Sequence, residues 1–206
     1  MMSPWTPHFQ KQDAKLLKEE TVFSGYSQVK QVEVQIPLFQ AGISHPLQRE
    51  LFCRPSAVAV LLLDPETNQV VMIEQFRPGA LFEGESPWLL EIVAGVIEAN
   101  DTPEASAYRE VKEETGCEIL SLILVCSYLV SPGISNEKII IYCARVKAPL
   151  AIEFHGLAEE GEDIKVHVFS TEGAFQLLSQ GKISSSPTII ALQWLQLNLS
   201  SLRFPQ

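Results

Sequence analysis

Apolar residues recur with the short period of a β-strand along the first quarter of the chain. Between residues 20 and 55 they stand at Val29, Val32, Val34, Ile36 and Leu38, and a turn is expected just beyond them, at residues 41 and 42. A period close to two residues is typical of strands, because successive side chains point to opposite faces. We therefore predict an N-terminal β extension over residues 1–55, followed by a main domain over residues 56–206.

The main domain begins with two continuous apolar runs. Residues 57–63 read AVAVLLL and residues 70–73 read VVMI, with the turn-rich segment DPETN between them. This arrangement predicts a hairpin of buried strands. Further strands are expected over residues 89–94, 122–130, 138–147 and 164–169. Helices are expected over residues 102–116, 170–180 and 187–202, the last with Trp194 in the core. Strands on both sides of a helix, with a long helix at the end, predict an α/β fold in which helices cover a mixed sheet.

The helix expected over residues 102–116 has clear signals at both ends and an unusual charge pattern inside. Either Thr102 is the N-cap, with Pro103 at the first helical position, or Asp101 is the N-cap, with Glu104 three residues later. Gly116 suits the C-terminal stop. Glu110 shares a helix face with both Glu113 and Glu114, and like charges three or four residues apart repel each other. A solvated acidic face is one explanation of such a run. The other is a hard divalent cation bound by the carboxylates.

Composition limits the classes of function. A formal net charge of -10 without a basic stripe argues against nucleic acid as a partner, whereas a small anionic substrate stays compatible where metal ions or arginines reverse the local potential. Cysteines at 53, 117, 126 and 143 have no paired spacing, which indicates reduced thiols and no zinc site. The first residues do not read as a signal peptide, and no apolar run reaches the ~18 residues of a membrane helix. We expect a soluble, cytoplasmic protein of one sizeable domain with an extension.

A longer motif around the acidic run resembles the box of the Nudix hydrolase family. The family pattern G-x5-E-x7-R-E-U-x-E-E-x-G-U, in which U is a bulky apolar residue, fits residues 95–117 without a gap. Asp101 stands where the family has Glu, and Cys117 stands at the final apolar position, where a thiol behaves as a small hydrophobe. The matching positions are Gly95, Arg109, Glu110, Val111, Glu113, Glu114 and Gly116.

This resemblance implies a Nudix-type α/β/α sandwich and hydrolysis of a diphosphate bond with Mg²⁺, for which Mn²⁺ is a possible substitute. It places the metal on the Ala94 carbonyl, Glu110 and Glu114. It gives Glu113 a helping catalytic role and makes Arg109 the ion-pair partner that orients the box carboxylates.

Segments outside the box resemble the ADP-ribose pyrophosphatase subgroup. Residues 131–133, Ser-Pro-Gly, resemble its proline landmark, with Glu137 as the substrate-side Glu that follows, although a plain turn is the alternative. Arginines are scarce in this acidic chain, and their planar fork suits phosphate. The resemblance assigns substrate binding to Arg49, Glu50, Arg54, Arg77, Val96, Ser131, Pro132, Gly133 and Glu137.

Two more segments carry the resemblance further. The acidic stretch HGLAEEGEDI, residues 155–164, resembles a loop that closes on the substrate, which implies Glu160 as general base and Glu162 as ligand of a further metal ion. A solvated loop is the alternative. Tyr26 lies in SGYSQV, which resembles the segment that stacks on adenine in the neighbouring subunit of dimeric relatives, and a core tyrosine is the alternative. The stacking interpretation implies a homodimer that exchanges its N-terminal β segment.

The function expected from these residues is Mg²⁺-dependent hydrolysis of ADP-ribose to AMP and ribose 5-phosphate. Two alternatives stay open. One is the same chemistry on another nucleoside diphosphate sugar, such as a GDP-mannose-like compound. The other is a catalytically silent module that senses ADP-ribose, against which the intact box argues. No nucleic acid and no membrane are expected as partners.

Overall fold

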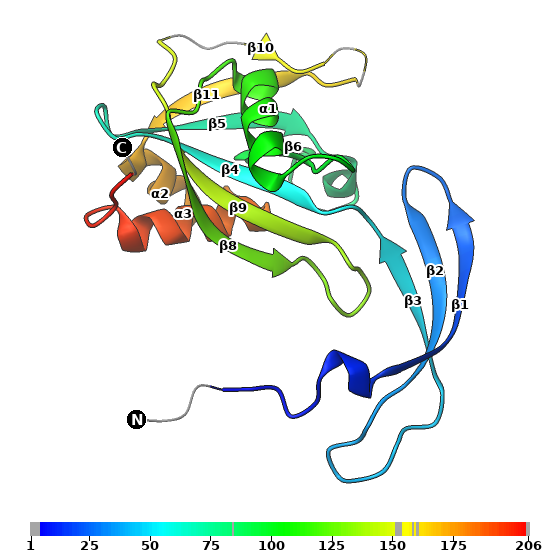
Figure 1. Ribbon diagram of the computed structural model, residues 1–206. Helices are drawn as coiled ribbons and strands as arrows, with labels where there is room; N and C mark the ends of the chain where they lie inside the picture. The colour runs from blue at the N-terminus through cyan, green and yellow to red at the C-terminus, as the bar shows by residue number, and fades with distance from the viewer. Residues whose placement is uncertain (1–4, 84, 151–153, 158, 160, 205–206) are drawn as a thin grey trace. The chain divides into compact units, whose positions relative to one another are not determined.

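A computed structural model describes residues 5–83, 85–150, 154–157, 159 and 161–204. The chain divides into two compact units, Met1–Arg54 with Leu129–Glu137 and Pro55–Tyr128 with Lys138–Gln206. The first contains a small sheet, and the second contains a large sheet and the α-helices (Figure 1).

The first unit is built on a three-stranded antiparallel sheet in the order β1-β2-β3. A short 3-10 helix, η1 (Lys11–Asp13), precedes β1 (Lys15–Ser24), β2 (Gln28–Gln35) and β3 (Leu47–Cys53). The expected turn lies between β2 and β3, where Ala41 and Gly42 both have positive φ. The strands predicted in this part of the chain are therefore confirmed.

A distant loop, residues 129–137, also belongs to the first unit. The Phe52 amide donates a hydrogen bond to the Ile134 carbonyl at 2.8 Å, and the Arg54 amide donates one to the Asn136 side chain at 2.9 Å. The sequence prediction ended this unit at residue 55. It did not include the loop, because a contact over about eighty residues leaves no local signal in the chain.

The second unit is a mixed eight-stranded sheet with helices on two sides. Its order is β10-β11-β5-β4-β9-β8, with β6 paired to β5 and β7 paired to β4, and β4 runs parallel to β9. The strands are β4 (Ala57–Asp64), β5 (Gln69–Phe76), β6 (Trp88–Glu91), β7 (Val93–Val96), β8 (Ser121–Leu129), β9 (Lys138–Arg145), β10 (Phe154–His155) and β11 (Ile164–Ser170). The helices are η2 (Pro78–Leu81), α1 (Pro103–Thr115), α2 (Thr171–Ser179) and α3 (Ser186–Asn198).

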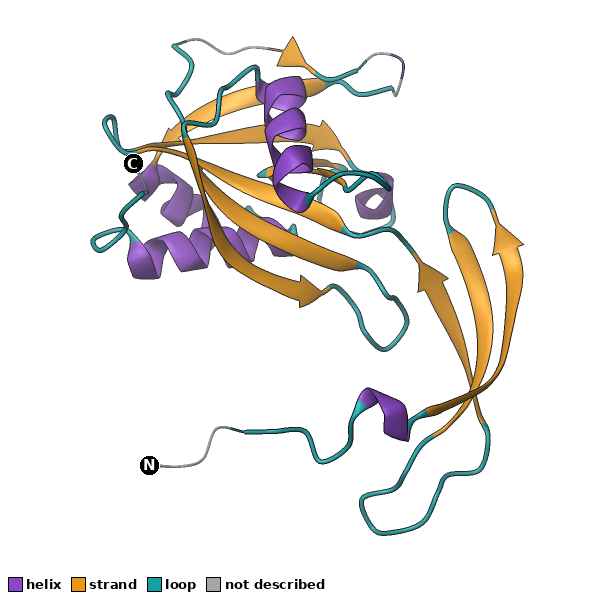
Figure 2. Ribbon diagram, viewed as in Figure 1, coloured by secondary structure: helices purple, strands orange, loops and turns teal. Residues whose placement is uncertain are grey.

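Strand β4 explains why an unbroken apolar run was needed. Its side chains alternate between two cores: Val58, Val60 and Leu62 pack in the core shared with α1, whereas Ala59, Leu61 and Leu63 pack in the core shared with α2 and α3. Figure 2 shows α1 on one side of the sheet and α2 and α3 on the other. Trp194 packs against the second core, as predicted. The α/β sandwich with a mixed sheet is confirmed.

The single strand expected over residues 89–94 is wrong in detail, because two strands replace it. β6 pairs with β5, and β7 pairs with β4. At the break, the Ile92 amide donates to the Thr188 hydroxyl of α3 at 3.0 Å. β7 also continues through Gly95 to Val96, which pairs with Ala57. The consequence is that β7 carries the residues before and after the box glycine alongside the central strand.

All four cysteines are free thiols, and Cys117 and Cys143 are buried. Burial raises the pKa of Cys143 to about 12, so this thiol stays protonated and unreactive. Among the described residues, no helix combines the length and the apolar character needed to cross a membrane.

Candidate active site

Helix α1 has the ends that its sequence predicts. The Thr102 hydroxyl accepts a hydrogen bond from the Ala105 amide at 3.1 Å, and Pro103 occupies the first turn. Gly116 has a φ of 67° and ends the helix, with its amide bonded to the Lys112 carbonyl. These caps fix the turn in which Glu110, Glu113 and Glu114 lie.

The helix approaches β7 closely at Gly95. A Cβ atom at this position would overlap the carboxyl group of Glu110. The glycine is therefore required by close packing and not by its backbone conformation. This contact brings the Glu110 carboxylate against the strand that carries Ala94.

Arg109 is the centre of an ion-pair network at the same end of β7. Its guanidinium lies 2.8 Å from a Glu110 oxygen and 3.0 Å from a Glu113 oxygen, and Nη2 donates to the Val96 carbonyl at 3.3 Å. Asp101 is more distant, at 3.9 Å from Nε. The predicted role of Arg109 as ion-pair partner of the box carboxylates is confirmed. Val96, which was predicted to bind substrate, therefore accepts a hydrogen bond from Arg109 through its backbone carbonyl.

Glu114 is the most buried acid of the group. Its side chain belongs to a residue only 2% exposed, and it accepts a hydrogen bond from the Ala94 amide at 3.2 Å. Burial raises the pKa of Glu114 well above its usual range, and the neighbouring charge of Glu110 raises it further. Burial also raises the pKa of Glu110 to about 7, although Arg109 opposes the shift. A cation bound beside these two carboxylates would therefore stabilise their charged forms.

The residues present fit a hard divalent cation by donor chemistry. Glu110 and Glu114 offer carboxylate oxygens, which Mg²⁺ and Mn²⁺ prefer, next to the backbone of Ala94. Within the described part of the chain, however, no three His, Cys, Asp or Glu side chains are gathered as a complete ligand set. The hydrogen bonds explain this arrangement, because Arg109 holds Glu110 and Glu113 while the Ala94 amide holds Glu114.

The acidic loop before β11 reaches this group through Glu162. The charge of Glu162 contributes to the raised pKa of both Glu110 and Glu114. Its carboxylate accepts a hydrogen bond from the Leu157 amide at 3.3 Å. Glu160, predicted as general base, lies outside the described residues.

A second ion pair joins Arg77 to Glu91, a residue that the sequence prediction did not include. The Nε of Arg77 donates to a Glu91 oxygen at 2.7 Å, and the Gln75 side chain donates to the same oxygen at 3.4 Å. Arg77 was predicted to bind substrate, but its partner was not identified. A signal was available, because an acid inside the otherwise apolar run LLEIVA is unusual.

The remaining predicted substrate residues lie in the first unit. Tyr26 is 88% exposed, which excludes a core role in this chain, and the Arg54 guanidinium lies over its ring at 6.0 Å from the centroid. Arg54 also forms an ion pair with Glu137 at 3.5 Å. The structure therefore brings Tyr26, Arg54 and Glu137 together.

The other members of this set are separate from that cluster. Arg49 and Glu50 are exposed on β3, and the Arg49 guanidinium donates to the Gln48 carbonyl at 2.7 Å. Residues 131–133 are exposed in a turn, in which the Ile134 and Ser135 amides donate to the Ser131 carbonyl.

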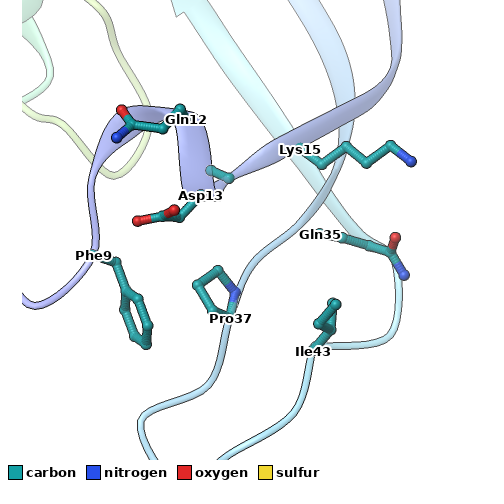
Figure 3. Close-up of a pocket in the computed structure, with 8 residues that line it drawn as sticks. Phe9, Gln12, Asp13, Lys15, Gln35, Pro37 and Ile43 are labelled. Carbon is teal, nitrogen blue, oxygen red and sulfur yellow. The ribbon is translucent and has the colours of Figure 1, made fainter.

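The first unit also contains a cavity of about 490 Å³ beside η1. Figure 3 shows Phe9, Pro37 and Ile43 along its apolar side, with Asp13 and Lys15 among its polar lining. None of the residues predicted to bind substrate lines it. The cavity is therefore separate from the predicted chemistry.

Comparisons with known proteins find relatives that match almost the whole chain. The sequence model of the NUDIX domain matches residues 54–192. The ADP-ribose pyrophosphatase of Haemophilus influenzae (strain ATCC 51907 / DSM 11121 / KW20 / Rd) is 41% identical over 199 residues, which cover 95% of this chain and 92% of the relative. The ADP-ribose pyrophosphatase of Escherichia coli (strain K12) is 42% identical over 195 residues, which cover 95% of this chain and 93% of the relative.

A solved structure shows the same fold at lower sequence identity. The crystal structure of an ADP compounds hydrolase aligns with a TM-score of 0.71 and 20% identity over 95% of this chain and 97% of that chain. The capped acidic helix, the close approach at Gly95 and the match over residues 54–192 lead to one conclusion: the chain belongs to the NUDIX family.

Proposed function

We propose that this protein hydrolyses the diphosphate bond of ADP-ribose to give AMP and ribose 5-phosphate. The observation that carries the proposal is a pair of mutually repelling carboxylates inside a NUDIX domain, the buried Glu114 and the partly buried Glu110, which contacts β7. Two relatives of similar length that carry the name ADP-ribose pyrophosphatase support this choice of substrate.

Glu110, Glu114 and the Ala94 carbonyl would hold Mg²⁺, with Mn²⁺ as a substitute, and Glu162 would hold a further ion. A cation held there would neutralise the charge of the diphosphate and would lower the pKa of a water molecule. Glu113 helps by fixing Arg109, with which it forms an ion pair, and Arg109 in turn orients Glu110. A carboxylate oxygen of Glu160 would accept the proton of the attacking water.

Substrate binding is divided between two sets of residues. In the second unit, Arg77 binds the diphosphate, and Val96 contributes its backbone next to the substrate. In the first unit, Tyr26 reaches the site of the neighbouring subunit and stacks on adenine there, and Arg54 extends that platform, because aromatic and guanidinium planes both stack on bases. Further polar contacts to the substrate come from Arg49, Glu50, Ser131, Pro132, Gly133 and Glu137.

We further propose that the protein is a homodimer that exchanges its N-terminal β segment. β1 is exposed along its whole length and carries the apolar residues Leu16, Val22 and Phe23. Exposed apolar strands are typical of surfaces that pair with another chain. Free thiols support a reducing compartment, which we take to be the cytoplasm, and the net charge of -10 argues against nucleic acid.

A product analysis tests the proposed reaction. The purified protein is incubated with Mg²⁺ and, separately, ADP-ribose or GDP-mannose, and the products are separated by ion-exchange chromatography. We expect AMP and ribose 5-phosphate from ADP-ribose, at a much higher rate than any product from GDP-mannose. Faster hydrolysis of GDP-mannose would contradict ADP-ribose as the substrate. Tight binding of ADP-ribose without any product would indicate a sensor and not an enzyme.

A further inference from the structure

Glu91 is a buried carboxylate at the end of β6, and the box chemistry does not account for it. The residue is 7% exposed, and one of its oxygens accepts from Arg77 at 2.7 Å and from Gln75 at 3.4 Å. Burying an ionised acid is costly unless a cation and further donors compensate it. Its neighbours in the chain, Leu90 and Ile92, are apolar, so packing alone would favour an apolar residue here.

Arg77 is anchored at one nitrogen and leaves the rest of its guanidinium available. Its side chain is 40% exposed, whereas that of Glu91 is 9% exposed. Within the described residues, the terminal nitrogens of Arg77 donate no hydrogen bond. A guanidinium is a rigid fork of five N–H donors, so a bond at Nε fixes the direction of the other donors.

The anchored arginine borders the carboxylate site. Glu91 lies three residues before Ala94, whose amide donates to Glu114 at 3.2 Å. Arg77 also acts on Glu114 electrostatically: burial raises the pKa of Glu114, and the positive charge of Arg77 is among the groups that lower it. The segment from β6 to β7 therefore carries both Glu91, the partner of Arg77, and Ala94, the partner of Glu114.

We propose that Glu91 is a positioning residue, which holds the Arg77 guanidinium at the edge of the carboxylate site so that its free N–H groups bind the substrate diphosphate. The inference rests on the proposed function and deepens it, because Glu91 does not touch the substrate itself. Arginine suits this role, since its planar fork binds phosphate oxygens in pairs.

A double-mutant cycle tests the inference, with KM and kcat measured on ADP-ribose with Mg²⁺ for wild type, Glu91→Gln, Arg77→Gln and the double variant. Glutamine keeps the volume and a carbonyl acceptor but removes the charge. We expect Glu91→Gln to raise KM by about 10-fold with little change in kcat, the pattern of lost substrate binding. In the Arg77→Gln background the same change should alter kcat/KM by less than about 2-fold.

A matched control separates positioning from general destabilisation. Asp64 is buried to the same degree, at 6% exposed, and accepts hydrogen bonds from the Glu66, Thr67 and Ala148 amides at the other end of β4. We expect Asp64→Asn to lower Tm but leave KM unchanged. If Arg77→Gln does not fold because Glu91 is left unpaired, Arg77→Lys replaces it, since lysine keeps the charge but not the fork.

The outcomes separate the two claims. If wild type hydrolyses ADP-ribose but the two substitutions have additive effects on kcat/KM, the role of Glu91 is overturned and the proposed function stands. An unchanged KM in Glu91→Gln has the same meaning. If wild type binds ADP-ribose without hydrolysis, the proposed function fails. The double-mutant cycle is then repeated with Kd values from calorimetry, and this result decides whether Glu91 positions Arg77. Absence of ADP-ribose binding overturns both.

Discussion

The carboxyl group of Glu110 occupies the space that a Cβ atom at Gly95 would need. One residue belongs to α1 and the other to β7, so this contact sets how closely the acidic helix approaches the strand.

Replacing Gly95 by alanine should displace Glu110 from β7. We expect kcat/KM on ADP-ribose to fall by roughly 100-fold and the free energy of unfolding to fall by about 1 to 3 kcal/mol, because the added methyl group overpacks the contact. Steady-state kinetics and urea denaturation measure both. Gly79→Ala is the matched control, because a Cβ there meets nothing within 4 Å. Equal behaviour of the two variants would contradict the proposed role of the contact.

Replacing Glu114 by glutamine should separate stability from function. The folded-state pKa of Glu114 is raised, so its contribution to stability is present below its unfolded value of 4.5 and is lost as pH rises through the folded value. At pH 7.5 without metal, Glu114→Gln should therefore stabilise the fold by roughly 1 to 3 kcal/mol, and the amide oxygen can still accept from Ala94.

The same variant should lose its response to Mg²⁺. We expect wild type to show a higher Tm in about 10 mM MgCl₂ than in EDTA, because a ligand that binds the folded state stabilises it. Glu114→Gln should show little shift, together with activity lower by roughly 100-fold or more. A full Mg²⁺-dependent shift in the variant would exclude Glu114 as a ligand.

The hydrogen bond between Tyr142 and Glu104 should shape the pH dependence of stability. The Tyr142 hydroxyl donates to Glu104 at 2.7 Å and links β9 to α1. Burial, and then the Glu104 bond, raise the pKa of Tyr142 above its usual 10.0, and that bond lowers the pKa of Glu104 below 4.5. Stability from the tyrosine is full below pH 10 and is lost above it, whereas stability from Glu104 is present above pH 4.5 and is lost as pH falls.

Tyr142→Phe should reduce both effects and cost about 1 kcal/mol near pH 7. Urea denaturation at about pH 3.5, 7 and 10.5 measures the free energy of unfolding in the acidic, neutral and alkaline ranges. Parallel curves for the variant and wild type across all three would mean that the bond does not contribute.

Tyr26 should affect substrate binding and not folding. Since its ring is 88% exposed and lies beside Arg54, we expect Tyr26→Ala to raise KM by roughly 10-fold or more, as loss of one base-stacking contact costs ~1 to 3 kcal/mol. Tyr26→Phe keeps the ring and serves as the control with unchanged KM. A Tm that falls in Tyr26→Ala with KM unchanged would indicate a structural role instead.

Features that depend on near neighbours in the chain were predictable. The caps of α1 follow from Thr102, Pro103 and Gly116, because capping bonds join residues only a few positions apart. The buried hairpin β4-β5 follows from two apolar runs and the turn between them. The break at Ile92 was not predictable, because it depends on Thr188, almost a hundred residues away.

The sequence by itself determined the α/β class, the capped acidic helix and the like charges that lie on one face of that helix, since each depends on local spacing or composition. Only the tertiary structure decided which side chains meet. It placed Glu91 against Arg77, joined residues 129–137 to the first unit, and buried Glu114 beside Glu110 deeply enough to raise its pKa. The physical reason is that desolvation and ion pairing depend on packing in three dimensions, and linear order does not encode them directly.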